Sequence, residues 1–179
     1  MKLIKQKISG LLLIKPILFR DNRGYFRRHF CKYEMKRAKV KFDVKQGNFS
    51  ENLKKGTLRG FHYQKSSKND SKILSCVSGS LINVTVDLRR RSETFLKSCI
   101  LKISSKSRES IYIPAGCANA FMTLENDTNI HYYMNEYYNK KNDSGFRYDD
   151  PTFNVKWPYR PKVISKKDLS FENFSISKL

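Results

Sequence analysis

Long apolar runs and targeting signals are absent from this chain of 179 residues. The longest apolar runs, such as Leu11-Leu12-Leu13-Ile14, stay far below the roughly 18 residues that a membrane-spanning helix requires. The apolar stretch near the N-terminus has no cleavage site of small residues, which a secretory signal peptide would carry. We therefore expect a soluble, cytoplasmic protein that makes no use of a membrane.

Cysteine and histidine are too scattered to predict a metal site or a disulfide scaffold. The four cysteines contain no C-x-x-C pair, which argues against a zinc ribbon, and their wide spacing is unlike a disulfide framework. The three histidines, His29, His62 and His131, form no two-His-plus-carboxylate pattern. We expect no metal, reduced thiols, and core positions for Cys76 and Cys99.

Acidic residues are scarce relative to basic ones. The chain has 16 Asp plus Glu against 36 Lys plus Arg, a formal net charge of +20. This balance is typical of a polyanion binder and equally of a soluble protein from a lysine-rich proteome. A basic nucleic-acid-binding protein is the weaker alternative, because the basic residues are spread along the chain and no recognised binding motif occurs. Hydrophobic residues at 39% and aromatic residues at 13% indicate a folded chain.

Short strand-like patterns dominate the secondary-structure signal. Alternating or β-branched runs predict strands at Lys72–Gly79, Ser80–Leu88, Ser98–Ile103, Glu109–Ile113 and Asn129–Tyr133, with turn residues between them. In the N-terminal half only Lys32–Lys39 looks helical, and a short segment near Lys166–Phe171 ends the ordered pattern. Many short strands separated by turns favour an all-β sandwich or barrel. We expect one domain, residues 1–179, with short N- and C-terminal appendages.

The first cluster with chemical potential is Leu58-Arg59-Gly60-Phe61-His62-Tyr63-Gln64. Strict alternation along a strand would place His62 on one face and Arg59 on the other. A structural histidine is the better interpretation of this segment taken alone.

Two further clusters follow in the chain. In Ile111–Phe121 a strand ends at Ile113-Pro114-x-Gly116 and returns, which places the Asn119 amide near a turn; a plain β-turn is the simpler interpretation. The segment His131–Tyr138 is crowded with tyrosines, and each buried phenol needs a hydrogen-bond partner. An aromatic ladder explains this segment, but a stacking platform or a proton donor does so as well.

Taken together and in order, these clusters resemble one family. The matching pieces are Asp21-x-Arg23-Gly24-x-Phe26, Gln46-Gly47-Asn48-x-Ser50, Leu58-Arg59-Gly60-x-His62-Tyr63-Gln64, Val86-Asp87-Leu88-Arg89, Ile113-Pro114-x-Gly116, Tyr132 before Tyr137-Tyr138, and Asp149-Asp150-Pro151 before Trp157-Pro158. From about Phe19 to Phe171 the chain resembles the dTDP-4-dehydrorhamnose 3,5-epimerase family. The resemblance implies a cupin jelly-roll barrel without cofactor, a homodimer, and an isomerase that inverts carbon 3 and/or carbon 5 of a nucleotide-diphosphate-linked 4-keto sugar in the synthesis of bacterial capsule or O-antigen.

The resemblance also implies roles for individual residues. It makes His62 the general base, Asp168 its orienting carboxylate and Tyr132 the acid on the opposite face of the sugar, with Lys72 beside the ketone. The substrate-binding residues that it implies are Arg23, Arg28, Gln46, Asn48, Arg59, Asn119, Tyr138, Asp143 and Lys167. Among these, Tyr138 corresponds to the aromatic residue that stacks on the base.

Elementary chemistry is consistent with this set. A proton next to a ketone is weakly acidic, so its removal needs a base and a group that stabilises the enolate oxygen. Inversion also requires that the proton returns from the other face, for which a tyrosine opposite the histidine is suitable. A nucleotide-sugar 3,4-ketoisomerase on the same fold begins with the same deprotonation and remains an alternative.

The chain departs from the family pattern at three positions. Asn119 and Asn83 stand where most members have a histidine and an aspartate, and neutral amides cannot relay a proton. This leaves open whether one carbon or both are inverted. Arg28 replaces a glutamate near the base pocket, which suggests GDP instead of dTDP and, by similarity to related capsule enzymes, a GDP-linked 4-keto heptose.

Overall fold

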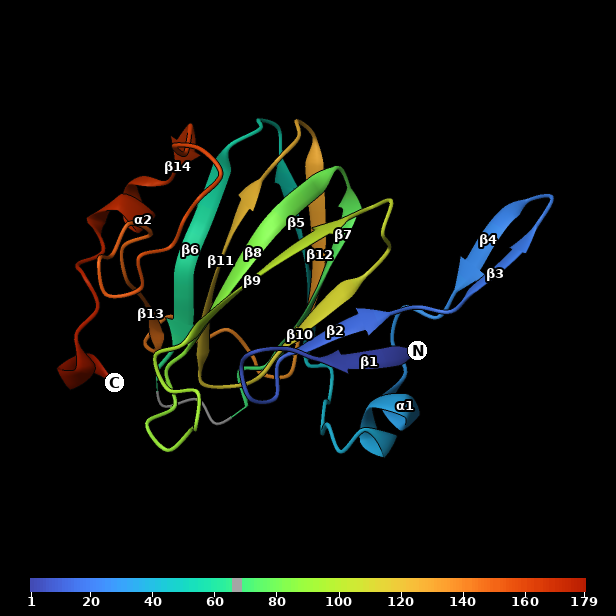
Figure 1. The fold of residues 1–179 in the computed structure, drawn as a ribbon, viewed down its shortest axis with the longest axis horizontal. Helices are drawn as coiled ribbons and strands as arrows, with labels where there is room; N and C mark the ends of the chain where they lie inside the picture. The colour runs from blue at the N-terminus through green and yellow to red at the C-terminus, as the bar shows by residue number, and fades with distance from the viewer. Residues whose placement is uncertain (66–68) are drawn as a thin grey trace.

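Two antiparallel β-sheets form the body of the protein in the computed structural model, which describes residues 1–65 and 69–179 (Figure 1). The first sheet has the order β1 (Lys2–Lys5), β2 (Leu12–Lys15), β10 (Ser110–Ile113), β7 (Lys72–Ser78), β12 (Thr128–Met134), β5 (Gln46–Asn52). The second has the order β13 (Asp143–Gly145), β6 (Thr57–Gln64), β11 (Cys117–Thr123), β8 (Ser80–Asp87), β9 (Ser98–Ser104), and β14 (Val163–Ile164) runs parallel to β6. The all-β expectation is confirmed.

The predicted elements occur close to their expected bounds. The five predicted strands are β7, β8, β9, β10 and β12, and the predicted helix is α1 (Lys32–Arg37), which ends before Lys39, a residue with a positive φ. The C-terminal segment contains α2 (Lys166–Ser170) and a 3-10 turn at Ile176–Lys178. The strand β5 had no sequence signal, because its Gln46-Gly47-Asn48 start is polar and its order depends on pairing with β12.

Apolar side chains from both sheets meet to form the core between them. Leu74, Cys76 and Ile111 of the first sheet pack with Leu81 and Phe121 of the second. Cys76 and Cys99 are buried as predicted, and all four cysteines are free. This core fills one part of the space between the sheets and leaves the rest to polar side chains.

The outer faces of the two sheets are covered by the N- and C-terminal segments. Phe146 and Phe153 of the C-terminal segment pack on Phe61 of β6, with the Phe61 and Phe146 rings stacked at a centroid distance of 4.6 Å. Met35 of α1 and Phe42 cover the outer face of the first sheet. In the described part of the chain, no helix is long and apolar enough to cross a membrane.

A hairpin of β3 (Leu18–Asp21) and β4 (Gly24–Arg27) projects from the body of the molecule (Figure 1). Phe19 and Phe26 on this hairpin are 62% and 67% exposed, so two large apolar side chains lie in solvent. A two-stranded hairpin with an exposed apolar surface is marginally stable by itself.

The alternation of side chains between the two faces of β6 changes phase at Gly60. The pairing of β6 with β11 shifts register between Asn119 and Phe121, and Gly60 has a φ of +113°. A Cβ at this glycine would lie 2.6 Å from the Asn119 carbonyl oxygen, so only glycine fits. The expectation that Arg59 and His62 face opposite sides is wrong, because this irregularity turns both side chains toward the same cavity.

A buried carboxylate holds the connection between β8 and β9. The side chain of Asp87 is fully buried and accepts two hydrogen bonds from the Arg89 guanidinium, at 2.8 and 2.7 Å, and one each from the Ser92 and Thr94 hydroxyls, both at 2.6 Å. Burial by itself would raise the pKa of Asp87, but these hydrogen bonds outweigh it and lower the pKa to about 2.

We expect Asp87→Asn to lower the free energy of unfolding by about 2 kcal/mol at pH 7. Because the pKa of Asp87 is depressed in the folded state, its contribution is present above the ordinary value near 4 and is lost as the pH falls through about 2. Urea unfolding from pH 7 to pH 2 should therefore show the difference between parent and variant shrinking below pH 4.

Asp149→Asn is the matched control for this experiment. Asp149 also forms a bidentate ion pair with an arginine two residues away, Arg147, but the Asp149 side chain is 44% exposed. An exposed pair contributes less than about 1 kcal/mol. An equal loss in both variants, or a difference that does not change with pH, would contradict the role given to Asp87.

Candidate active site

Two adjoining cavities, of about 350 and 370 Å³, lie between the sheets at the polar end of the barrel. They share His62 from β6, Lys72 from β7 and Tyr132 from β12. Because they share these three residues, the cavities are two parts of one site. We call the part that extends toward Gln46 and Tyr138 the outer cavity, and the part that extends toward Arg59 and Asn119 the inner cavity.

His62 is paired with Asp168, as predicted. The His62 Nε2 lies 2.9 Å from Asp168 Oδ1, and the other carboxylate oxygen accepts a hydrogen bond of 3.0 Å from the Gly60 backbone N–H. Asp168 is buried, and its position is fixed because the Ser165 side chain caps the first turn of α2 by accepting from the Asp168 N–H. The imidazole is thus oriented by a carboxylate that two elements hold in place.

Hydrogen bonds favour the ionised form of the Asp168 carboxylate. Burial alone would raise the pKa of Asp168, but the hydrogen bonds from His62 and from the Gly60 N–H outweigh it, and the pKa lies below its ordinary value. Asp168 therefore stays an acceptor at neutral pH and holds the imidazole by the nitrogen it binds, which leaves the other ring nitrogen available to act as a base.

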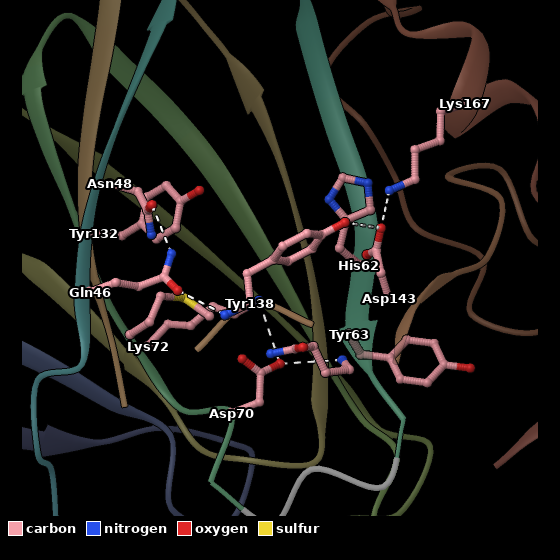
Figure 2. A pocket seen from close by; sticks show the side chains of 12 residues that line it. Gln46, Asn48, His62, Tyr63, Asp70, Lys72, Tyr132, Tyr138, Asp143 and Lys167 are labelled. Carbon is pink, nitrogen blue, oxygen red and sulfur yellow. Dashed lines mark hydrogen bonds and ion pairs between the residues drawn. The ribbon is translucent and has the colours of Figure 1, made fainter. Parts of the chain in front are cut away.

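Tyr132 faces the same cavities from the other sheet. It lies on β12 opposite Leu74 of β7 and Asn48 of β5, and Figure 2 shows it across the cavity from His62. Burial raises the pKa of the Tyr132 phenol, an effect that the charge of Arg59 only partly offsets. The phenol consequently keeps its proton at neutral pH and can donate it.

Lys72 begins β7 and points into the site. Its ammonium donates to Asn119 Oδ1 at 3.3 Å, the Asn119 amide nitrogen donates to Asn83 Oδ1 at 3.5 Å, and the Asn83 amide donates to Thr85 at 3.0 Å. This chain of bonds fixes the direction of both buried amides. Asn119 therefore presents an acceptor to the lysine and no group that can take up a proton.

Arg59 lines the inner cavity. Its Nε donates to Asn52 at 2.9 Å and its NH2 donates to the Glu51 carbonyl at 3.2 Å, so its guanidinium is held against β5. The phase change at Gly60 is what lets Arg59 and His62 share this cavity.

The residues expected to bind the nucleotide gather at the outer cavity (Figure 2). Gln46 Nε2 donates to Asn48 at 3.0 Å, and Gln46 Oε1 accepts from the Tyr138 N–H at 2.8 Å. Asp143 accepts from the Tyr138 hydroxyl at 3.0 Å and pairs with Lys167. The ring of Tyr138 is 56% exposed, which leaves a face free for stacking.

Two predicted binding residues lie outside these cavities. Arg23 forms an ion pair of 2.6 Å with Asp21 at the tip of the β3–β4 hairpin, and its side chain is 86% exposed. Arg28 pairs with Glu34 of α1 at 2.8 Å. Neither arginine lines a cavity with His62 in its own chain.

Asp70 belongs to the site and was missed by the sequence analysis. It is buried and lines the outer cavity beside Lys72. The available signal was its place two residues before Lys72 in an extended segment, a spacing that puts side chains on one face.

Two histidines outside the site, His29 and His131, also lie close together. The His29 and His131 rings lie 5.5 Å apart, next to Tyr133 on the outer face of the first sheet, a proximity that their separation in sequence concealed. In residues 1–65 and 69–179, no group of three His, Cys, Asp or Glu side chains is placed to hold a metal ion.

The chain matches the family model described as dTDP-4-dehydrorhamnose 3,5-epimerase over residues 5–175. It is 33% identical to the dTDP-4-dehydrorhamnose 3,5-epimerase of Shigella flexneri, over 97% of this chain and 96% of that protein. The chain belongs to the dTDP-4-dehydrorhamnose 3,5-epimerase family. Its activity is accordingly that of a 3,5-epimerase of nucleotide-linked 4-keto sugars, an isomerase of deoxysugar synthesis, which selects this function over the ketoisomerase and the nucleic-acid binder.

Solved structures of the family superimpose closely. The dTDP-4-dehydrorhamnose 3,5-epimerase of Bacillus anthracis, with TDP and PPi bound, has a TM-score of 0.93 at 31% identity, over 97% of this chain and 99% of that chain. The dTDP-6-deoxy-D-glucose-3,5-epimerase of Legionella pneumophila, in complex with dTDP-4-keto-L-rhamnose, has a TM-score of 0.90 at 30% identity, over 96% and 92%. The expected cupin jelly-roll fold is confirmed.

Proposed function

We propose that His62 of this epimerase removes the proton next to the ketone and that Tyr132 delivers its own phenolic proton to the other face, after which both side chains recover their protonation states by exchange with solvent. The observation that carries the proposal is that these two side chains come from opposite sheets and line the same cavities. Asp168 orients the imidazole and stabilises its charge once it has taken the proton. Lys72 stabilises the negative charge that develops on the ketone oxygen.

One base is enough for both carbons. In a chair-shaped 4-keto sugar with equatorial substituents, the hydrogens on the two carbons that flank the ketone are axial and lie on the same face of the ring. A small shift of the ring would bring either hydrogen to His62 while Tyr132 stays on the opposite face. The Asn119–Asn83 amide pair then binds and orients without transferring protons, and we propose that both carbons are inverted.

The ligand is a nucleoside diphosphate carrying the keto sugar. Lys167 lines one of the joined cavities and Arg59 lines the other, so both contribute positive charge for a diphosphate, and the exposed Tyr138 ring offers a face to the base. Relatives from Bacillus anthracis and Legionella pneumophila hold TDP and a dTDP-linked sugar, which makes dTDP the first nucleotide to test. The preference for GDP and a heptose depends on Arg28, which reaches no cavity of its own chain.

A homodimer would give Arg23 and Arg28 a role. We propose that the β3–β4 hairpin of each protomer packs on its partner, which would cover Phe19 and Phe26 and carry these arginines toward the partner's cavity. Exposed apolar side chains on a projecting hairpin support this arrangement, because a monomer gains nothing from them.

Two variants separate the base from the acid. With His62→Asn we expect solvent deuterium to enter the substrate at least about 100-fold more slowly, because the base is lost, with nucleotide binding nearly unchanged. With Tyr132→Phe we expect deuterium still to enter but the inverted product to be lost or altered. Proton NMR in deuterium oxide measures both, and unchanged exchange in the first variant or a normal product in the second would refute the respective role.

The extent of the reaction is read from the same spectra. Parent enzyme with a dTDP- or GDP-linked 4-keto sugar should incorporate deuterium at both carbon 3 and carbon 5. Asn119→His, which restores the imidazole typical of the family, should leave both positions labelled. Deuterium at one carbon in the parent and at two in this variant would instead show that the amide pair restricts the reaction.

The dimer is tested by complementation between two defective chains. Arg23→Ala should raise KM about tenfold or more through loss of a phosphate contact, and His62→Asn should be inactive. If Arg23 acts in the partner's site, a mixed dimer contains one site with both an intact His62 and an intact Arg23, so co-expression restores low-KM turnover. No recovery in a mixture shown by light scattering to be dimeric would place Arg23 in its own chain's site or in none.

A further inference from the structure

Asp70 is the buried acid of the site that the proposed chemistry leaves without a role. The residue is 3% exposed, and it lies between β6 and β7 beside the lysine that begins β7. Its Oδ2 is 3.9 Å from the Lys72 ammonium and accepts a hydrogen bond of 3.3 Å from the Gln64 N–H at the end of β6. Figure 2 shows Asp70 on the same wall of the cavity as Lys72.

Of the two Asp70 carboxylate oxygens, only Oδ2 has a hydrogen-bond partner in the part of the chain that the structure describes. Asp70 Oδ1 is buried and has no hydrogen-bond partner within the described residues. A buried anion with an unpaired oxygen is unfavourable for stability, and an asparagine of the same shape would avoid the cost of burying the charge. The presence of a carboxylate here is therefore better explained by its charge than by its contribution to folding.

The negative charge of Asp70 lies closest to the Lys72 ammonium, at 3.9 Å, among the ion pairs described for it. The Lys72 side chain is 13% exposed, and its ammonium lies between the Asp70 carboxylate and the Asn119 amide oxygen. An ammonium has three N–H donors at the end of a flexible stem. One donor is bonded to the Asn119 oxygen, and the Asp70 carboxylate attracts the charge from 3.9 Å, so the two groups restrict the position of the ammonium and leave donors for the cavity.

We infer that Asp70 is a positioning residue that sets the Lys72 ammonium against the ketone oxygen of the bound sugar. This inference rests on the proposed function, because it acts through the role given there to Lys72. A donor that is already in place when charge develops on the enolate oxygen stabilises the transition state without reorganisation, whereas a mobile ammonium must first be ordered. Asp70 itself does not contact the reacting atoms.

A double-mutant cycle tests the inference. Lys72→Met should reduce the rate of epimerisation and of deuterium entry about 100-fold. Asp70→Asn, with Lys72 present, should reduce kcat between about 10-fold and 100-fold with little change in KM. In the Lys72→Met background, Asp70→Asn should have no further effect, because the group that Asp70 positions is gone.

The thermal midpoint and a control variant separate positioning from folding. Asp70→Asn should keep or raise the midpoint of unfolding, since it removes a buried charge. Asp43→Asn removes an exposed carboxylate that pairs with Lys32 and Lys45 outside both cavities, and it should leave turnover unchanged.

The outcomes distinguish the inference from the proposed function. If Lys72→Met is impaired while Asp70→Asn is fully active, or if Asp70→Asn costs the same factor in both backgrounds, the positioning role is wrong and the role of Lys72 stands. If Lys72→Met is fully active, the role of Lys72 in the proposed function fails, and the positioning role fails with it.

Discussion

The site depends on the way the Asp168 carboxylate joins the C-terminal segment to β6. One of its oxygens receives the His62 imidazole and the other receives the Gly60 N–H, while Ser165 fixes its place at the start of α2. His62 is thus held by a residue more than a hundred positions away in the chain. The same segment is attached to the sheet by the packing of Phe146 and Phe153 on its outer face, so the carboxylate that orients the imidazole belongs to a segment held at more than one place.

A barrel of two sheets solves the stereochemical problem of inversion. The proton must leave one face of the ring and return to the other, and a base and an acid on one strand or one sheet could not stand on both sides of the sugar. His62 on β6 and Tyr132 on β12 lie on sheets that face each other. The apolar core between the sheets keeps the two sheets apart, and polar side chains line the cavities beyond this core.

Two buried amides, Asn83 and Asn119, connect the second sheet to Lys72 of the first. Asn83 donates to Thr85, and the resulting orientation passes through Asn119 to the Lys72 ammonium. In this chain the pair is a fixed support for a cation. The lysine thus has a hydrogen bond from its ammonium to Asn119 and an ion-pair contact of 3.9 Å with Asp70.

The sequence was enough to predict the strands that alternate apolar and polar residues, the family, and candidate site residues, most of which line the two cavities. It could do so because period-two burial and short motifs such as Leu58–Gln64 are local properties of the chain. The folded structure was needed to show that Arg59 shares a cavity with His62, because the phase change at Gly60 depends on the approach of β11. It also decided that Arg23 and Arg28 stand outside the chain's own cavities and that Asp70 lies against Lys72. Contacts of this kind arise where separate strands and segments meet in space, and no local pattern encodes them.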